Sequence, residues 1–438
     1  MRRDGWFAMR RLSQSNIGTP FVITPLFQLL HHHVWRRLPV GPRRALFARI
    51  SAWRAPAIST EAQARQPFII VGFLNQTSGL GDAARKSHDA LKAAGFEVYG
   101  IDVTATLMHE ANYPDFRFDD GRELVGAGTL IIHVSGPSIP RVMAFLGRRL
   151  VTGKRVVAHW FWELPKLPRD WRRALPFVHD FCASTRFVAD AIRPLAEARP
   201  VHVVNYPLTV PASGGRAPKA AASPFTALVL FNIASNFARK NPCAAIRAFR
   251  RAFGDDPGVR LVVKYLNAAA WPEAMKEMRA AAGGAANIVM NGEVLDDAGI
   301  DALYAEADAV VSLHRAEGLG LAVAEAMMRG IPVIATDWSG NTDFFSAQCG
   351  FPIGYRLVPI EDPQSNYAGK GVAWDDPADA RWAEPDIEEA ADALKILRSD
   401  PDLRQRLGAA GIRQARAFFD PALHVERLSA LLLSEPPR

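Results

Sequence analysis

The sequence is poor in cysteine, with three residues among 438. Cys182, Cys243 and Cys349 lie far apart, and none belongs to a C-x-x-C pair. This scarcity excludes a disulfide framework, and the spacing excludes a thiolate zinc site. We therefore expect a protein of the reducing cytoplasm.

Long apolar runs are also missing. None approaches the roughly 20 residues that a membrane-spanning helix needs, and the N-terminus lacks the charged, apolar and small-residue order of a secretory signal. We expect a cytoplasmic protein, either soluble or peripheral on the inner face of the cell membrane. Hydrophobic residues still form 49% of the chain, which at this length indicates two or three domains with a large core.

Acidic residues are scarce at the N-terminus. Residues 1–54 hold ten arginines and one acid, Asp4, which is +9, so the rest of the chain is close to −2 although the net charge is +7. The basic excess belongs to an N-terminal arm, residues 1–66, and we expect no nucleic-acid partner. Arginine pairs alternating with apolar stretches favour an anionic membrane surface for residues 1–54, with a solvated leader as the alternative. Adjacent histidines at 31–33 point in different directions, which disfavours metal binding.

Strand and helix patterns alternate through the remainder of the chain. One series covers residues 67–210, a Pro-, Gly- and Ala-rich linker covers 211–224, and a second series covers 225–415. A C-terminal helix at 416–438 is expected to pack back toward the first domain. The alternation predicts an α/β fold with two Rossmann-like, doubly wound domains facing each other across a ligand-binding cleft.

Two glutamates flank a glycine-containing turn in HRAEGLGLAVAEAM, residues 314–327. Glu317 lies between a strand pattern and a helix pattern, and Glu325 lies about one turn into the helix. Gly318 and Gly320 allow a ligand close to the backbone, where free N–H groups favour an anion. Carboxylates accept hydrogen bonds from paired hydroxyls, so a nucleotide sugar suits the pattern. The favourable placement of an acid near a helix N-terminus explains Glu325 but not the glycines.

This stretch resembles the E-x7-E signature of the retaining GT-B glycosyltransferases of glycosyltransferase family 4. TDWSGNTDF, residues 336–344, resembles the segment that follows the signature in exopolysaccharide and lipopolysaccharide transferases. The resemblance covers roughly residues 67–430 and implies a GT-B fold with the donor in the C-terminal domain. It implies that Glu317 contacts hydroxyls of the donor sugar and Glu325 the ribose. It also implies that backbone amides of the turn approach the sugar and diphosphate, namely those of Gly318, Leu319, Gly320 and Leu321.

A diphosphate beside two carboxylates requires cations, and SNFARKNPCAAIRAF supplies Arg239 and Lys240. The family usually has an arginine, four residues and then a lysine here. Lys240 matches the lysine, Ser235 stands at the arginine position, and Arg239 is the expected substitute. Arg315 is a third candidate cation. The alternative is that Arg239 and Lys240 are solvated residues at a helix entrance.

A D-x-D motif in a strand context is absent, and the paired aspartates fall in turn-like stretches. Because lysine and arginine can neutralise a leaving diphosphate, we expect no metal. We also expect no cofactor, only a UDP- or GDP-sugar as the donor substrate.

The loop RVVAHWFWELPKLPRDW, residues 155–171, resembles the YWAWELP-type segment of exopolysaccharide transferases. Family members keep a histidine or another polar group near the transferred sugar at this place. His159 and Glu163 are therefore expected to join Lys240 as catalytic residues. The aromatic rings at 160–162 either stack on an acceptor sugar or pack in the core.

NQTSGLGDAAR has the outline of a dinucleotide fingerprint, with Gly79 and Gly81 between a strand and a helix. The first glycine comes late, and no acidic residue stands clearly on a strand end about 20 positions onward, which disfavours a nicotinamide oxidoreductase. The transferase interpretation assigns both glycines to the acceptor side of the cleft.

The resulting hypothesis is a retaining, metal-independent glycosyltransferase, a hexosyltransferase of surface polysaccharide synthesis. It would move a sugar from a nucleotide-diphosphate sugar to a glycan or lipid-linked oligosaccharide acceptor. A nucleotide-sugar 2-epimerase and a non-catalytic GT-B scaffold subunit are the alternatives. The SGN segment favours transfer over epimerisation, and the presence of Glu317, Glu325 and Lys240 argues against a scaffold.

Overall fold

The structure is a computed structural model that describes residues 48–113, 115–210, 223–367 and 372–432. Residues Ile50–Arg438 form one compact unit. The arginine pairs and histidines of the predicted arm lie outside the described residues, as does most of the predicted linker. In the described ranges, no helix combines the length and the apolar character needed to cross a bilayer.

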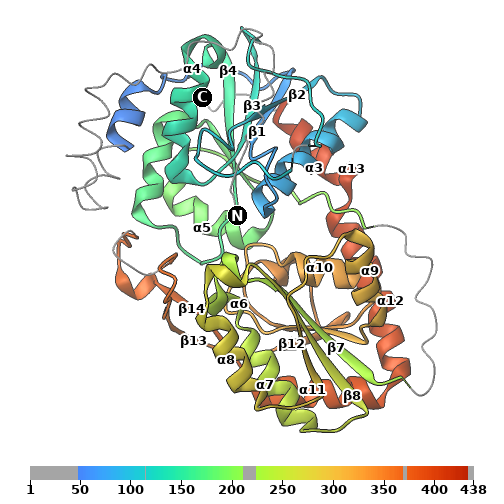
Figure 1. Ribbon diagram of the computed structural model, residues 1–438. Helices are drawn as coiled ribbons and strands as arrows, with labels where there is room; N and C mark the ends of the chain where they lie inside the picture. Colours follow the sequence, from blue (N-terminus) through green and yellow to red (C-terminus); the bar gives the residue numbers. More distant parts are fainter. Residues whose placement is uncertain (1–47, 114, 211–222, 368–371, 433–438) are drawn as a thin grey trace, which may run out of the picture. The chain divides into compact units, whose positions relative to one another are not determined.

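The N-terminal part contains a six-stranded parallel sheet in the order β2-β1-β3-β4-β5-β6 (Figure 1). Its central strands are buried along their whole length, as strands of a parallel sheet covered on both faces are. The strands are β1 (Phe68–Gly72), β2 (Val98–Asp102), β3 (Gly128–His133), β4 (Lys154–Trp160), β5 (Asp180–Ala183) and β6 (Val201–Val203). The helices between them are α3 (Gly79–Ala93), α4 (Ile139–Val151) and α5 (Arg186–Ala196).

The C-terminal part contains a second parallel sheet, in the order β12-β11-β10-β7-β8-β9. The chain runs outward from β7 to β9 and then returns to β10, so β7 and β10 flank the point where the strand order reverses. Ligands of open α/β sheets bind at such a point, beyond the carboxyl ends of the strands. The strands are β7 (Phe225–Asn232), β8 (Val259–Leu266), β9 (Ile288–Asn291), β10 (Ala309–Ser312), β11 (Val333–Thr336) and β12 (Gly350–Ile353).

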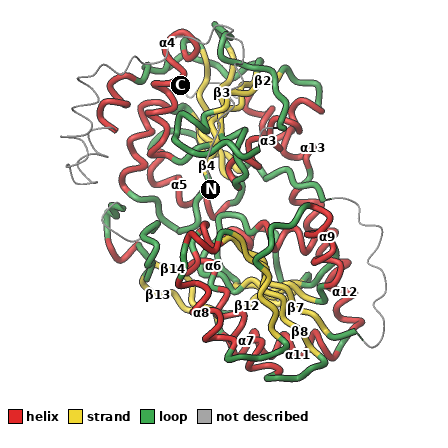
Figure 2. Tube along the Cα trace, in the orientation of Figure 1, coloured by secondary structure: helices red, strands yellow, loops and turns green. Residues whose placement is uncertain are grey.

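Helices cover both faces of this second sheet, and Figures 1 and 2 show α7, α8 and α11 grouped apart from α9, α10 and α12. Their bounds are α6 (Phe237–Lys240), α7 (Pro242–Phe253), α8 (Glu273–Ala282), α9 (Asp297–Glu306), α10 (Leu321–Met328), α11 (Ile387–Ser399) and α12 (Pro401–Phe419). Together the two sheets and their helices confirm the predicted α/β class with two Rossmann-like domains.

Two features were not expected from the sequence. An antiparallel hairpin, β13 (Tyr355–Pro359) and β14 (Arg381–Pro385), follows β12. The long C-terminal helical pattern is also broken between α11 and α12, because Asp400 caps the second helix by accepting from Leu403 N and Pro401 begins it.

Helix α13 (Pro421–Ser429) packs against α3 of the N-terminal part. His424 is fully buried, with Nε2 3.0 Å from the Ser87 hydroxyl and Nδ1 2.6 Å from the Asn205 carbonyl oxygen. The chain thus returns from the second sheet to the first at its C-terminus.

Candidate functional site

The glycine-containing turn joins β10 to α10 and is held by a second turn that follows β11. The Glu317 amide donates to the Ser339 hydroxyl over 2.8 Å, and the Gly340 amide donates to the Glu317 carbonyl over 2.8 Å. A Cβ atom at Gly340 would lie 2.0 Å from the Gly318 carbonyl oxygen, so only glycine fits there. Gly320 has a φ of +91°, in the left-handed region, and is the N-cap of α10. This packing fixes where the Glu317 side chain leaves the turn.

Lys240 and Arg239 both pair with Glu317. The Lys240 ammonium lies 2.5 Å from one carboxylate oxygen, and the Arg239 guanidinium lies 3.1 Å from the other. Arg239 is 3% exposed and Glu317 is 8% exposed. Burial alone would raise the pKa of Glu317, but the two cations hold it at about 2, so the carboxylate is ionised at neutral pH. Burial lowers the pKa of Lys240, and Glu317 offsets part of that decrease.

Arg239 is held in place by the backbone around it. Its guanidinium donates to the carbonyl oxygens of Ala316 over 2.7 Å and Ser235 over 2.8 Å. Asn236, with a φ of +82°, caps the short helix α6 by accepting from Arg239 N. Ser235, at the family's arginine position, thus contributes its backbone, while the guanidinium comes from Arg239. The surrounding negative groups raise the pKa of Arg239 against the opposing effect of burial.

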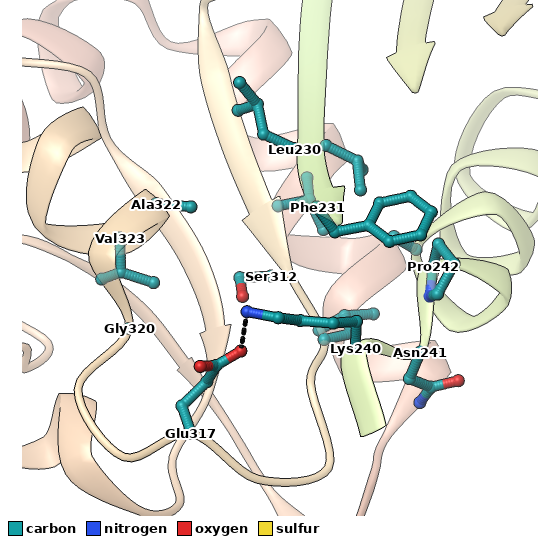
Figure 3. Close-up of a pocket in the computed structure, with 14 residues that line it drawn as sticks. Leu230, Phe231, Lys240, Asn241, Pro242, Ser312, Glu317, Gly320, Ala322 and Val323 are labelled. Carbon is teal, nitrogen blue, oxygen red and sulfur yellow. Dashed lines mark hydrogen bonds and ion pairs between the residues drawn. The ribbon is translucent and has the colours of Figure 1, made fainter. Parts of the chain in front are cut away.

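A pocket opens where Lys240 meets Glu317, at the carboxyl ends of β7 and β10 (Figure 3). Figure 3 shows the Lys240 side chain crossing the pocket to Glu317, with Phe231 and Pro242 beside it. Its walls come from the ends of both strands, the start of α7 and the start of α10. They are formed by Val229, Leu230, Phe231, Asn241, Pro242, Ala245, Val311, Ser312, Leu313, Gly320, Ala322 and Val323.

Glu325 has different surroundings from Glu317. Its carboxylate accepts a hydrogen bond from the Tyr304 hydroxyl over 2.9 Å, and it is not among the residues that line this pocket. Burial raises the pKa of Glu325, and the Tyr304 hydrogen bond and the nearby Arg329 and Lys86 counteract that increase. Lys86 belongs to α3, so groups from both halves of the chain surround this carboxylate.

Gly318, in the same turn, contacts the N-terminal part directly. The Thr185 hydroxyl donates to the Gly318 carbonyl over 2.9 Å. A Cβ atom at Gly318 would lie 2.6 Å from the Trp162 carbonyl oxygen. Leu319 is buried in the core, and Leu321 is half-buried at the first position of α10. Gly318 therefore lets the two halves of the chain approach each other at the turn.

His159 is enclosed near the end of β4. It is 2% exposed, its Nε2 lies 3.1 Å from the Ser184 hydroxyl, and its ring stacks on Phe161 at 5.0 Å. The His133 ring lies 4.8 Å from the His159 ring, between centroids. Burial, together with nearby histidines, lowers the pKa of His159 well below its ordinary value, so the ring is neutral at physiological pH.

Glu163 lies in the loop after β4 and accepts a hydrogen bond from the Tyr367 hydroxyl over 3.1 Å. It also adds to the negative potential at Arg239. Glu163 therefore interacts electrostatically with the cation site. Of the aromatic residues before it, Trp160 and Trp162 are buried in the core, and Phe161 is half-buried.

Gly79 and Gly81 both lie in the first turn of α3. A Cβ atom at Gly81 would lie 2.5 Å from the carbonyl oxygens of Phe73 and Gln76, so the loop before the helix is tightly folded. Open space surrounds Gly79. Neither glycine is among the residues that line the Lys240 pocket.

Arg315 is engaged elsewhere, because it pairs with Glu384 at 2.6 Å and donates to the Ala238 carbonyl. Tyr304, Tyr367 and Ser339 contact the predicted site and were not identified from the sequence. Within the described ranges, no three His, Cys, Asp or Glu side chains are grouped so as to hold a metal ion.

Comparisons with known proteins agree on the fold. A family model described as family 4 glycosyltransferase in conflict systems matches residues 185–417, just over half of the chain. A glycosyltransferase from Rickettsia africae is similar with a TM-score of 0.60 at 13% identity, covering 84% of this chain and 98% of that one. HepE from Anabaena, solved with UDP and glucose, has a TM-score of 0.56 at 15% identity, covering 84% and 99%.

TarM from S. aureus, solved with UDP, fondaparinux and α-GlcNAc-glycerol, has a TM-score of 0.51 at 13% identity. The match covers 70% of this chain and 55% of TarM, so this chain spans little more than half of that protein. No curated protein sequence matches the chain. The family match, together with the GT-B fold of these structures, gives the assignment: the chain belongs to the family 4 glycosyltransferases.

Proposed function

We propose that the protein is a retaining, metal-independent glycosyltransferase that uses a UDP- or GDP-sugar. The observation that carries the proposal is the pairing of Lys240 and Arg239 with Glu317 at the carboxyl ends of β7 and β10. Two cations suit a diphosphate, and an ionised carboxylate suits the sugar hydroxyls beside it. UDP accompanies a sugar or glycan in the HepE and TarM structures, which supports this donor class.

In the proposed reaction, the bond between the anomeric carbon and the phosphate oxygen breaks, and its electron pair stays on the nucleoside diphosphate. Lys240 and Arg239 stabilise that developing charge, so no metal ion is required. An acceptor hydroxyl bonds to the anomeric carbon on the same face, and its proton passes to the departing phosphate oxygen. Before this step, Lys240 has to exchange part of its contact with Glu317 for the phosphate.

The remaining predicted residues take supporting parts in this proposal. Glu325 accepts from the ribose hydroxyls, and the amides of the turn approach the diphosphate. Glu163 approaches the sugar from the N-terminal side in this proposal, and its electrostatic effect on Arg239 supports that role. His159 is enclosed and hydrogen-bonded to Ser184. We therefore assign it a structural part on the N-terminal side of the site and not proton transfer. The acceptor is a glycan or lipid-linked oligosaccharide of surface polysaccharide synthesis.

Donor binding tests the site. In calorimetric titrations with UDP-, GDP- and ADP-sugars, we expect one base to be preferred. Lys240→Ala and Glu325→Ala should each weaken binding at least tenfold, since each removes an interaction with a charged group. Lys395→Ala in α11, which removes an exposed lysine paired with Asp392, is the matched control. Unchanged affinity in both site variants would refute the assignment, and an epimerised nucleotide sugar formed without an acceptor would favour the epimerase.

We further propose that residues 1–54 attach the enzyme to the inner face of the cell membrane. The support is the charge of +9 in this segment. The full chain should sediment with vesicles containing anionic lipid and remain in solution with neutral vesicles. Equal sedimentation of the full chain and a chain lacking residues 1–54 would contradict the proposal.

A further inference from the structure

The segment between β13 and β14 contacts both halves of the chain. It leaves β13 after Pro359 and returns at Arg381, and the structure describes its residues 360–367 and 372–380. Beyond the first of these ranges, the Ala373 carbonyl accepts from Arg169 N over 2.7 Å. A segment that belongs to the second sheet by connectivity is thus bonded to the first half.

Hydrogen bonds join the start of this segment to the short helix α6, which carries Arg239 and Lys240. Asp362 accepts from the Asn236 side-chain amide over 2.6 Å. Gln364 accepts from the Phe237 backbone amide over 2.5 Å. Asn236 in turn caps Arg239 N, so these contacts fix the short helix from which Arg239 and Lys240 project.

Tyr367 then reaches the other half of the chain. Its amide donates to Asp362 over 2.7 Å, and its hydroxyl donates to Glu163 over 3.1 Å. The ring is 6% exposed and packs edge-on against Trp162 at 5.6 Å between centroids. Burial raises the pKa of the Tyr367 phenol well above its ordinary value, so the hydroxyl keeps its proton and acts as a donor.

Arg239 interacts electrostatically with the carboxylates of Glu317 and Glu163. Burial lowers the pKa of Arg239, and the negative charges of Glu317 and Glu163 raise it. The same Arg239 pairs directly with Glu317. A continuous series of polar contacts therefore runs from the loop after β4, through Tyr367, to the short helix that carries Arg239 and Lys240, and on to Glu317.

We infer that Tyr367 is a positioning residue that holds the Glu163 carboxylate beside the Arg239–Glu317 pair. This inference rests on the proposed function, because it concerns how a group from the N-terminal half is brought to the donor site. Tyr367 contacts Glu163 through one hydroxyl, whereas its ring packs separately on Trp162. Removing the hydroxyl should therefore release Glu163 and leave the packing of the ring intact.

Tyr367→Phe tests this inference, with Tyr355→Phe in the same hairpin as the matched control. Tyr355 is 39% exposed and its ring packs on Trp338, so its hydroxyl has no part in the site. In sugar-transfer assays, Tyr367→Phe should lower kcat about tenfold and change the donor KM less than twofold. In a Glu163→Ala background it should lower kcat less than twofold, because its effect passes through Glu163. Independent, multiplicative losses in the double variant would overturn the inference.

A second measurement does not depend on turnover. Amide hydrogen exchange in the loop at 161–167 should be faster in Tyr367→Phe than in the wild type, and unchanged in Tyr355→Phe. Exchange that is the same in all three proteins would refute the inference. Absence of transfer and of donor binding by the wild type would instead refute the proposed function, and the exchange experiment would still decide the role of Tyr367.

Discussion

At the scale of single residues, the site depends on keeping Glu317 ionised although it is buried. Burial by itself would favour the neutral acid, and a neutral acid would donate to a sugar hydroxyl as well as accept from it. Lys240 and Arg239 reverse this preference and hold the pKa at about 2. The carboxylate is thus an acceptor throughout the physiological pH range. Removing either cation would leave a buried charge uncompensated, which is costly.

Glu325 is the contrasting case, because burial raises its pKa and a tyrosine hydroxyl counteracts that effect. The Tyr304 hydroxyl is 2.9 Å from one carboxylate oxygen, and Arg329 covers the Tyr304 ring at 4.4 Å. We expect Tyr304→Phe to weaken nucleotide-sugar binding about tenfold, because the freed carboxylate is no longer oriented and is more easily protonated. The loss should grow as pH falls from 7.5 to 5.5, since protonated Glu325 accepts less well.

Calorimetric titration of the preferred nucleotide sugar at several pH values measures this effect. Tyr355→Phe, which alters an exposed tyrosine, should bind as the wild type does. An equal loss at every pH would contradict the argument, because it would show that Tyr304 does not control the protonation of Glu325.

The sequence could identify Glu317, Lys240 and Arg239 because charge chemistry and a turn pattern are local features. It could not identify Tyr367, whose partner Glu163 is 204 positions away. Such a partner follows from the packing of two halves of the chain and has no local periodicity. Tyr304 was missed for a related reason, since a tyrosine in an apolar helix pattern is expected in a core.

At the scale of elements, the strands were predictable because buried parallel strands are continuous apolar runs. The hairpin β13–β14 was not, because its first strand is largely exposed and lacks an alternating apolar pattern. That omission mattered, since the hairpin carries the segment that contacts Glu163. The reversal of strand order between β7 and β10, which locates the pocket, is likewise a property of the topology and not of either strand.

The glycine turn between β10 and α10 makes a testable contact with the loop after β4. We expect Gly318→Ala to lower the free energy of unfolding by about 1 to 3 kcal/mol, as overpacking does, because its Cβ would lie 2.6 Å from the Trp162 carbonyl oxygen. Donor binding should fall with it, since the displaced turn carries Glu317.

Gly411→Ala in α12 is the control for this substitution. Its Cβ would make ordinary contacts at 3.5 Å with Met327, and alanine is about 1 kcal/mol better than glycine inside a helix. Chemical unfolding should therefore find the Gly411 variant as stable as the wild type or more so. A Gly318 variant of wild-type stability would mean that the turn and the loop separate freely.

At the scale of the whole molecule, the two sheets are joined by α13 as well as by the hairpin segment. His424 on α13 is buried against Ser87 and Asn205 of the first half. A positive charge on His424 would lower the pKa of His133 and of His159, which lie at the ends of β3 and β4. Three buried histidines thus lie close to the contact that returns the chain to its first half.

These histidines predict that the protein loses stability as the solution becomes mildly acidic. Burial lowers the pKa of His133 to about 3 and of His424 to about 4, and it lowers that of His159 well below its ordinary value. In the unfolded chain each has a pKa of about 6.5, so below that pH the unfolded state binds more protons than the folded state. The free energy of unfolding is therefore not reduced by these histidines above about pH 7, and it declines as the pH falls toward 4.

Each histidine contributes a slope of up to about 1.4 kcal/mol per pH unit in this window. Glu317 contributes at lower pH, because its stabilising effect is lost only between about 4.5 and its pKa of about 2. Urea unfolding at intervals from pH 7.5 to 5 should thus measure the effect of the histidines apart from that of Glu317. Burial also lowers the pKa of His314 and of His179, so five histidines contribute to the slope. His424→Gln should therefore reduce the slope by about a fifth, and His109→Gln, at an exposed position, is the control. A slope that is the same in His424→Gln as in the wild type would show that the junction at α13 is not sensitive to protonation of this residue.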